Sequence, residues 1–572
     1  MAAGWAALLL TACTGPAGPP ASARSGEVPP GAATVAAEGR PGGVLRFALA
    51  GEPDTFNPLA AADSRSRTVA YLTSATLLET TPETNEVVCG LCEDHALEPD
   101  AGSLSLTLRE GLRFSDGTPV SVDDIRFVFD RIYAPDSHNV LREMLLVEGE
   151  PIRVEVAGPR SVRFRFPAPC PSCPYLLAQV PLLPRHLLDG WPGGIESAWT
   201  LDTPPARMAG LGPFRIRTHE PGQRTVLEAN PYYWRVDQQG IQLPYLDELT
   251  LEFVPDRSNR LLRLEAGSLD IVDQLLQPED WQLVRNGGKA RVIDAGPSST
   301  LSFFWFNLGS PPSKKPWVLR KEFRHAVSRV LNRRDMVTHV YRGYASPAYS
   351  LLSSAHGMWF VPPSETQGPD TEAALQELRQ LGLSLQQSGG SRQLKDPAGQ
   401  TIGFELLTRT DEAMGRTAAL IQQDLAQVGI EVQIRQEEMR AVIARISSTR
   451  EYEAALMTLD IPLEPSSISN LLLSSGSMHV WNPGQARPAT EWERQVDELM
   501  RRVLREADPE VRLRNFHQVQ QILADELPLI PLVNRNVVVA VSPHVNGVVI
   551  ANRFPYSLAE VWRIWRHGEG PH

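Results

Sequence analysis

The sequence predicts a mixed α/β protein made of more than one domain. Its 572 residues exceed what a single hydrophobic core usually organises. Residues 104–108 alternate between apolar and polar side chains like a half-buried strand, and residues 121–132 follow with apolar side chains at helical spacing. An amphipathic helix predicted at 418–428 is likewise followed by a strand, predicted from alternating residues at 430–434. Helices and strands therefore alternate along the chain, as in α/β folds.

The composition excludes some partners. Hydrophobic residues make up 42% of the chain and charged residues 21%, as in globular proteins. The formal net charge of −12 argues against nucleic acid or an anionic membrane surface as the main partner.

The N-terminus resembles a lipoprotein export signal. The apolar run Gly4–Ala12 is far shorter than the ~20 residues that span a bilayer. It leads into Cys13 through Leu-Thr-Ala, which resembles a lipobox. The resemblance implies cleavage before Cys13 and a lipid anchor on its thiol, hence an extracytoplasmic protein. The alternative is a cysteine that follows a short apolar run by chance, and the usual basic residues are missing. Residues 14–40, rich in Pro, Gly, Ala and Ser, are expected to form a disordered tether.

Hydrophobic periodicity, together with turn and capping residues, predicts the helices and strands of the folded part in order along the chain. In the most informative block, Ser-Asp-Gly forms a turn, and Ser121 with Asp124 forms a capping box before the helix. Glycines at 267, 343 and 429 end three further helices. The expected strands are 42–49, 104–108, 162–166, 249–253, 430–434 and 452–459, and the expected helices are 71–78, 121–132, 260–266, 320–343, 418–428, 496–505 and 511–523.

Three pieces carry a resemblance to one family. The block from Leu104 to Ile132 closely resembles the signature of extracytoplasmic solute-binding proteins of the peptide/nickel class, the dipeptide- and oligopeptide-binding subunits of ABC importers. Gly210–Phe214 and Leu527–Val533 are similar to further family segments. The resemblance runs from about residue 42 to about residue 533. It implies a two-lobed periplasmic-binding-protein fold of type II, with the first lobe enlarged by a small extra domain.

The resemblance also implies a domain division. We expect a signal at 1–13, the tether at 14–40, a first-lobe main domain at 41–68 with 201–297 and 534–572, a first-lobe small domain at 69–200, and a second lobe at 298–533.

Peptide-binding members of the family hold an extended ligand between the lobes and bind its α-amine with an aspartate that follows an apolar strand. Asp460 follows such a strand here. It is the candidate amine ligand, and the alternatives are an ordinary turn residue or Glu464, because the spacing departs from the relatives by about one residue. Glu52 resembles the first-lobe loop that lines the ligand, or lies in an ordinary turn. Trp481 forms a pocket wall or packs in the core. The residue that binds the ligand's carboxylate is not identified among four basic candidates: Lys314, Lys315, Arg320 and Arg342.

Four further cysteines form two C-x-x-C pairs, Cys89 with Cys92 and Cys170 with Cys173. Structural disulfides suit an exported protein, and bridges between the two pairs are expected rather than bridges within them. A tetrathiolate zinc site also fits the pattern. A redox-active pair at a helix start is a third interpretation, for Cys170 and Cys173.

The sequence lacks the H-E-x-x-H, G-x-S-x-G and P-loop motifs. We therefore expect a non-enzymatic, monomeric receptor that binds short peptides and delivers them to an ABC permease, with no cofactor unless zinc occupies the cysteines. The alternatives are another solute, such as an oligosaccharide or a metal chelate, or a zinc- or thiol-dependent envelope protein.

Overall fold

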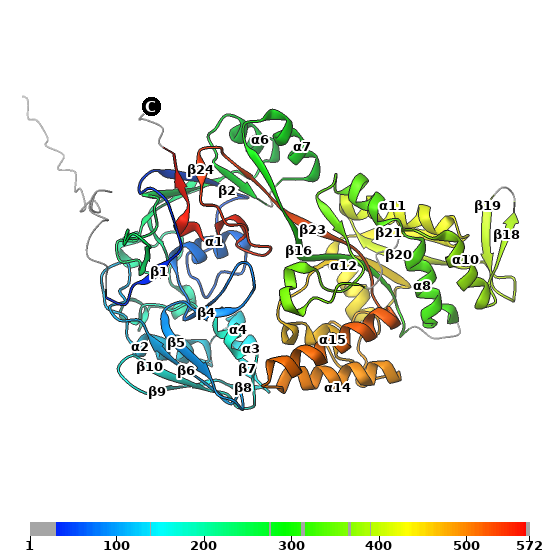
Figure 1. The fold of residues 1–572 in the computed structure, drawn as a ribbon, viewed down its shortest axis with the longest axis horizontal. Coiled ribbons are helices and arrows are strands. Elements are labelled where there is room, and N and C mark those ends of the chain that lie inside the picture. Colours follow the sequence, from blue (N-terminus) through cyan, green and yellow to red (C-terminus); the bar gives the residue numbers. More distant parts are fainter. Residues whose placement is uncertain are drawn as a thin grey trace, which may run out of the picture.

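Two long strands join two lobes (Figure 1). The computed structural model describes residues 30–135, 137, 139–273, 276–309, 315–363, 368–388 and 391–567. Strands β16 (Arg291–Phe306) and β23 (Ile530–Val541) are antiparallel neighbours that run from one lobe into the other. The α/β, two-lobed expectation is therefore confirmed. Cys13 and the signal at 1–13 lie outside the described residues.

The two crossing strands belong to one eleven-stranded sheet. Its order is β11-β12-β14-β2-β15-β23-β16-β22-β20-β21, with β17 paired to β23. The first-lobe strands are β11 (Phe214–Glu220), β12 (Arg224–Ala229), β14 (Glu248–Phe253), β2 (Val44–Leu49) and β15 (Ile271–Asp273). The second-lobe strands are β17 (Ala345–Pro347), β20 (Gly403–Arg409), β21 (Glu431–Glu437) and β22 (Ala454–Asp460).

The crossing strands are regular at their ends and irregular between them. Arg291 to Ile293 lie opposite Val541 to Val539 in the first lobe, and Phe303 and Phe304 lie opposite Pro531 and Ile530 in the second. Between these regular parts the register shifts three times, at 294–297, at 297–301 and between 302 and 303. Gly296 has φ +85°, a backbone conformation that other residues seldom adopt. Such irregularities bend a strand, so this stretch is where the sheet turns from one lobe to the other.

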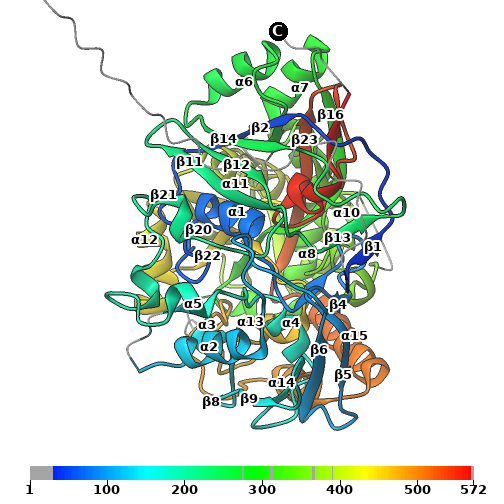
Figure 2. The same cartoon turned by 90° about the vertical axis from the view of Figure 1, so that its left-hand side faces the viewer.

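A second sheet lies at the lower end of the first lobe (Figure 2). Its antiparallel order is β5 (Cys92–Leu97), β6 (Ser103–Leu108), β10 (Ser161–Arg165) and β9 (Arg153–Val156). The rings of Phe129 and Phe164 lie 5.2 Å apart where helix α2 (Val122–Ile132) packs on this sheet. The predicted strand at 104–108, the helix at 121–132 and its capping box are thereby confirmed.

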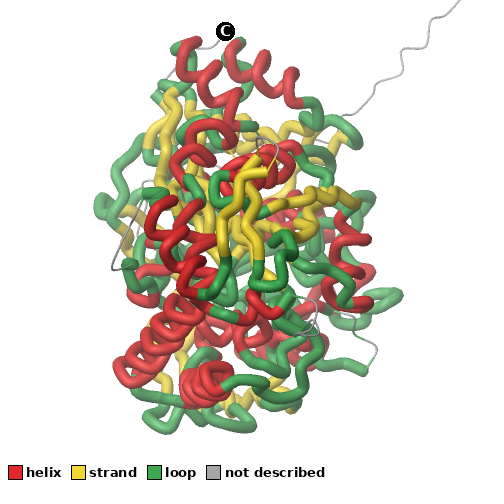
Figure 3. Tube along the Cα trace, turned by 90° about the vertical axis from the view of Figure 1, so that its right-hand side faces the viewer, coloured by secondary structure: helices red, strands yellow, loops and turns green. Residues whose placement is uncertain are grey.

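Helices surround the strands of the second lobe (Figure 3). They include α8 (Lys321–Val330), α10 (Thr371–Gln380), α11 (Glu412–Ala426), α14 (Glu491–Arg505) and α15 (Pro509–Glu526). The single helix expected over 320–343 is wrong: α8 ends at Val330, Leu331 is extended, and Asn332 caps the short helix α9 (Arg333–Asp335). The break lets the buried Arg333 guanidinium donate to three backbone carbonyls, each at 2.9 Å.

The expected disordered tether also needs correction at its end. Residues 33–35 form strand β1 (Ala33–Val35), which pairs in parallel with β13 (Arg235–Asp237). Ala37 is buried against the first-lobe core. β1 and β13 form a two-stranded sheet of their own, so backbone pairing fixes the Ala-Thr-Val run on the first lobe. The described part of the tether thus belongs to the first lobe from residue 33 on.

The other elements connect or cover these layers. They are β3 (Leu78–Thr80), β4 (Val87–Cys89), β7 (Leu146–Val147), β8 (Glu150–Pro151), β18 (Ser384–Ser388), β19 (Ser391–Lys395), β24 (Val545–Asn546), β25 (Trp565–Arg566), α1 (Ser64–Thr73), α3 (Val140–Met144), α4 (Cys173–Leu177), α5 (Arg185–Leu188), α6 (Arg257–Glu265), α7 (Pro278–Gly287), α12 (Met439–Ile443) and α13 (Ser469–Leu472). None of the helices in the described ranges has both the length and the apolar character needed to cross a membrane.

Separate hydrophobic clusters fill the lobes. The largest combines residues from 37–271 with residues from 537–564, and two others lie within 301–533. Both ends of the described chain therefore build the first lobe. The domain limits expected from the sequence stay a prediction.

The lobes also touch each other away from the crossing strands. The buried side-chain amide of Asn85 donates to the carbonyl of Ala355 across the lobe boundary at 2.8 Å. At another point Arg416, on α11, lies 3.2 Å from Glu279, on α7. These polar contacts hold the two lobes in the arrangement seen here.

Asp124 offers a test of how the small domain is held. Its carboxylate accepts from the Ser121 backbone N–H at 2.8 Å and from the Arg185 backbone N–H at 3.0 Å. We expect Asp124→Ala to lower the free energy of unfolding by about 1–3 kcal/mol, because a cap and a buried acceptor are lost. Asp130→Ala, on the exposed face of α2, should change it by less than about 0.5 kcal/mol. Urea unfolding followed by circular dichroism checks both, and equal effects would contradict this account.

Candidate functional site

The carboxyl ends of three parallel strands meet at one edge of the second lobe. Strands β20, β21 and β22 run in parallel and end at Arg409, Glu437 and Asp460. In α/β sheets ligands bind outside the carboxyl ends of such strands. The residue Asp460 lies opposite Thr300, beside the irregular stretch of β16 that leads into the first lobe. This edge is the candidate ligand site.

The side chain of Asp460 is exposed and its backbone is fixed. The Thr300 hydroxyl donates to its Oδ1 atom. The next residue, Ile461, donates its N–H to the Ser299 carbonyl at 3.1 Å. The carbonyl of Ile461 lies 3.2 Å from Nε2 of His356, whose pKa is lowered to about 4 by burial. A neutral imidazole therefore holds the turn that follows Asp460.

A first-lobe tyrosine stands near this second-lobe carboxylate. Tyr556 is half-buried. Burial is the main cause that raises its pKa to about 12, and the negative charge of Asp460 adds to the rise. The phenol is therefore protonated at neutral pH and can donate a hydrogen bond at the lobe boundary. Tyr556 was not predicted from the sequence, because no motif marks it and Asp460 lies 96 residues upstream of it, on the other lobe.

A buried carboxyl group lies behind Tyr556. Asp273, at the end of β15, accepts the Ser557 hydroxyl at 2.5 Å and the Ser557 N–H at 3.3 Å. Burial raises the pKa of Asp273 to about 6, and the two hydrogen bonds from Ser557 oppose that rise. This carboxyl group anchors the segment that carries Tyr556.

The structure places Glu52 within the first lobe. Its Oε1 accepts the Gly222 N–H at 2.9 Å and lies 3.0 Å from Nε2 of His219. These contacts tie the loop after β2 to the β11–β12 hairpin. A role for Glu52 in ligand binding stays a prediction.

Two other candidates, Trp481 and Glu464, are buried and make their contacts inside the second lobe. Trp481 is fully buried, with its ring centroid 4.1 Å from that of His479, so its ring faces no solvent and the core-packing alternative describes it. Glu464 is also buried; it accepts from the Arg512 guanidinium and from the Ser466 N–H at 2.8 Å. Burial raises the pKa of Glu464, against the opposing effect of Arg512. Of these second-lobe candidates, only Asp460 presents an exposed carboxylate.

Three of the four basic candidates already have acidic neighbours. Lys315 lies 2.6 Å from Glu453. Arg320 is 3.3 Å from Glu322, and Arg342 is 3.7 Å from Glu279. The fourth, Lys314, lies outside the described residues.

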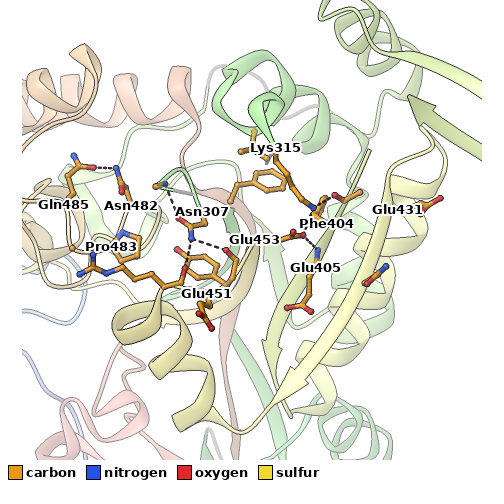
Figure 4. Close-up of a pocket in the computed structure, with 18 of the residues that line it drawn as sticks. Asn307, Lys315, Phe404, Glu405, Glu431, Glu451, Glu453, Asn482, Pro483 and Gln485 are labelled. Carbon is orange, nitrogen blue, oxygen red and sulfur yellow. Dashed lines mark hydrogen bonds and ion pairs between the residues drawn. The ribbon is translucent and has the colours of Figure 1, made fainter. Parts of the chain in front are cut away.

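A cavity of about 990 Å³ lies at the opposite end of the same strands (Figure 4). Glu453 precedes β22 and lines this cavity, whereas Asp460 ends β22. At about 3.3 Å per residue, the strand separates the two places by roughly 20 Å. Figure 4 shows Lys315 and Glu453 directed toward each other there, with Glu405 beside them. We favour the Asp460 edge as the ligand site because it lies at the carboxyl ends of the strands and against the other lobe.

Comparison with known proteins identifies the family. Residues 86–479 match the model of the bacterial extracellular solute-binding proteins, family 5. The chain belongs to this family. A probable ABC transporter-binding protein of Deinococcus radiodurans is 26% identical over 411 residues, which is 69% of this chain and 68% of the relative. The glutathione-binding protein GsiB of Salmonella typhi is 24% identical over 468 residues, 80% of this chain and 82% of that protein.

The fold is that of solved family structures. The oligopeptide-binding protein AppA of Bacillus subtilis, solved with a nonapeptide, superposes with a TM-score of 0.65 and 22% identity, covering 93% of this chain and all of that one. This family 5 protein is thus an extracytoplasmic solute-binding protein of the peptide/nickel class.

The cysteine pairing corrects the sequence-based expectation. This family 5 protein has two disulfides, Cys89–Cys92 and Cys170–Cys173, each within its own C-x-x-C pair. The expected bridges between pairs are wrong. Each pair lies in a local turn that brings its two Cα atoms to 5.0 and 5.3 Å, so a bridge needs no distant partner.

The same cysteines bear on the zinc interpretation. Bridged sulfurs are not thiolates, the form that binds zinc. His95 lies next to the first pair, with Nδ1 3.5 Å from Sγ of Cys89, and Cys89, Cys92 and His95 could together hold a metal ion after reduction. That group takes one C-x-x-C pair only, so it differs from the tetrathiolate site expected from the sequence.

The pairing can be checked by digestion without reductant. Trypsin cleaves after arginine, so residues 68–109 and 166–185 form two separate peptides, each with one cysteine pair. We expect each to be lighter by two hydrogen atoms than its reduced form in mass spectrometry, with no linked species. Replacing Cys170 and Cys173 by alanine should lower the free energy of unfolding by about 2 kcal/mol, the chain-entropy value for so short a loop. A peptide of linked mass would instead restore the bridges between pairs.

Asp273 predicts a pH-dependent stability. Its pKa is raised to about 6 in the folded protein from an ordinary value of 3.8, mainly by burial. The folded state therefore binds more protons than the unfolded state between these pH values, and stability falls as pH rises through that window. The Asp273→Asn side chain does not ionise, so this variant lacks the fall in stability with rising pH, and its amide oxygen keeps an acceptor for Ser557. Its stability relative to wild type should increase by about 2 kcal/mol between pH 4 and pH 7, measured by urea unfolding. A difference that stays constant with pH would refute the assignment.

Proposed function

We propose that this family 5 protein is the receptor of an ABC importer that binds short peptides between its lobes. The observation that carries the proposal is the exposed carboxylate of Asp460 at the carboxyl end of β22, at the lobe boundary. In this role the closed, loaded form would be presented to a membrane permease, and a lipid on Cys13 would hold the receptor at the membrane.

The chemistry of Asp460 suits a peptide ammonium. Thr300 donates to one carboxylate oxygen, Oδ1. Within the described residues, no side chain donates to the other oxygen or forms an ion pair with this group. A carboxylate hydrogen-bonded to an ammonium gains a charge-assisted contact, and the gain grows when closure of the lobes removes water.

Tyr556 would complete the site from the opposite lobe. Its neutral phenol can donate to the ligand or to Asp460, and it contacts the ligand only when the lobes are close together. A ligand that touches both lobes stabilises the closed arrangement by its differential affinity for it. Two relatives are consistent with a peptide: GsiB is named for glutathione binding, and AppA was solved with a nonapeptide.

Asp460 can be tested with alanine peptides of two to five residues. Isothermal titration calorimetry should show binding of the free peptides and at least about tenfold weaker binding of their N-acetylated forms, since acetylation removes the ammonium. At a hundredfold excess over its dissociation constant, a bound peptide should add about 2.7 kcal/mol to stability in thermal unfolding. Asp460→Asn should lose at least about tenfold in affinity for the free peptides.

Glu451→Gln is the matched control, because it removes an exposed carboxylate that precedes the same strand and should leave the affinity unchanged. Equal binding of acetylated and free peptides would remove Asp460 as the amine ligand. Stabilisation by an oligosaccharide or a metal chelate, without any peptide response, would replace the peptide with another solute. Destabilisation of the reduced protein by a chelator, again without a peptide response, would favour a metal-dependent function at the cysteines.

A further inference from the structure

We propose that Arg535, on the crossing strand β23, binds the carboxylate of a short peptide whose ammonium is held by Asp460. The inference rests on the proposed function, because it names the partner for the second end of the same ligand. It makes the site specific for peptides of about two or three residues with both ends free.

Strand pairing places the two charged residues close together. Asp460 lies opposite Thr300 on β16, and the neighbouring Leu301 lies opposite Asn534 on β23. The Asn534 side-chain amide also donates to the Thr300 carbonyl at 3.3 Å. Arg535 is the next residue, so two strand spacings separate it from Asp460, or about 10 Å.

The two side chains share one face of the sheet. Thr300 and Ser302 alternate on β16, so both point to the side on which Thr300 contacts Asp460. The Ser302 hydroxyl lies 3.3 Å from the Tyr341 hydroxyl on that side. Burial raises the pKa of Tyr341, and the positive charge of Arg535 opposes the rise. Val533 lies opposite Ser302, and Arg535 is two residues farther along β23, so the Arg535 side chain is on this same face. Its positive charge opposes the rise at Tyr556 as well.

The backbone of Arg535 is fixed while its guanidinium is available. Its carbonyl accepts the Ser298 hydroxyl at 2.7 Å, and Ala345 on β17 lies opposite it. The side chain is exposed. Among the residues that the structure describes, no carboxylate lies within ion-pairing distance of it and no group accepts a hydrogen bond from it. The basic candidates Lys315, Arg320 and Arg342 differ in this respect, since each has an acidic neighbour.

Arg67 is the other cation whose charge acts on Tyr556. It lies on α1 in the first lobe, and its guanidinium is 5.2 Å from the centre of the Phe554 ring. Its distance from Asp460 changes when the lobes move. Asp460 is paired with Thr300 on β16, and Asn534, the residue before Arg535, is paired with the neighbouring Leu301, so Asp460 and Arg535 stay together on the second-lobe side when the lobes move. A fixed distance between a carboxylate and a guanidinium is what selects a ligand by its length.

The spacing sets the ligand size. An extended peptide spans at most about 3.3–3.6 Å per residue, so two or three residues cover roughly 7–11 Å. That range matches the two strand spacings between the charged residues, with the flexible arginine side chain taking up the remainder. A bidentate guanidinium–carboxylate pair gives such a contact direction as well as strength.

The test compares free peptides with peptides whose carboxylate is blocked. Calorimetry with trialanine and trialanine amide should show at least about tenfold tighter binding of the free acid to the wild type. Arg535→Gln should bind both forms equally, at about the affinity of the wild type for the amide. Arg535→Lys should restore part of the difference, and Arg67→Gln should keep all of it. Pentaalanine should bind more weakly than trialanine to the wild type, and about equally to Arg535→Gln.

The outcomes separate this inference from the proposed function. A loss of the free-acid preference in Arg67→Gln and not in Arg535→Gln would overturn the inference and assign the carboxylate to the first lobe. Amides that bind as well as free acids, while acetylation still weakens binding, would overturn only the role of Arg535. Failure of every alanine peptide to bind would overturn the proposed function itself. Unchanged melting temperatures of the ligand-free variants would show that a loss of affinity does not come from misfolding.

Discussion

One constraint organises the whole molecule: two antiparallel strands, β16 and β23, are hydrogen-bonded to each other in both lobes. Both lobes therefore share a single sheet, and their relative position is set by a short stretch with shifted register around Gly296. The carboxyl end of β22, with the exposed Asp460, lies beside this stretch. A bend there changes the distance between the lobes, while the strand pairs on each side stay intact.

Buried charges inside the second lobe have local partners, whereas Asp460 and Arg535, at the lobe boundary, form no ion pair among the described residues. Arg333 donates to backbone carbonyls, and Glu464 is paired with Arg512. Burying such groups without partners would cost several kcal/mol each. Asp460 and Arg535 are exposed and lack ion-pair partners among the described residues. This contrast between satisfied and available charge, more than the volume of any cavity, distinguishes the strand ends as the place where a charged solute gains most from binding.

Local pattern was enough for much of the fold. Alternation and capping predicted β6 and α2, because each depends on neighbours in sequence. The strand that ends at Asp460 could be predicted for the same reason. Tyr556 and Arg535 could not, since their importance comes from pairing between segments far apart in the chain. The helix break at Leu331 follows from the tertiary contacts of Arg333, which periodicity does not reveal. The cysteine pairing was mispredicted because spacing alone does not fix which sulfurs meet.

The two lobes also differ in how the chain supplies them. The first-lobe core joins residues near the start of the folded body, such as Phe47, to Val539 and Trp562 near its end, whereas most of the second lobe comes from one continuous stretch between them. If the chain leaves the membrane N-terminus first, the second lobe can assemble while the first still lacks its last strands. The first lobe is completed only when residues from β23 onward emerge. Premature termination would therefore yield a secreted fragment with exposed first-lobe core, a natural substrate for envelope proteases and chaperones.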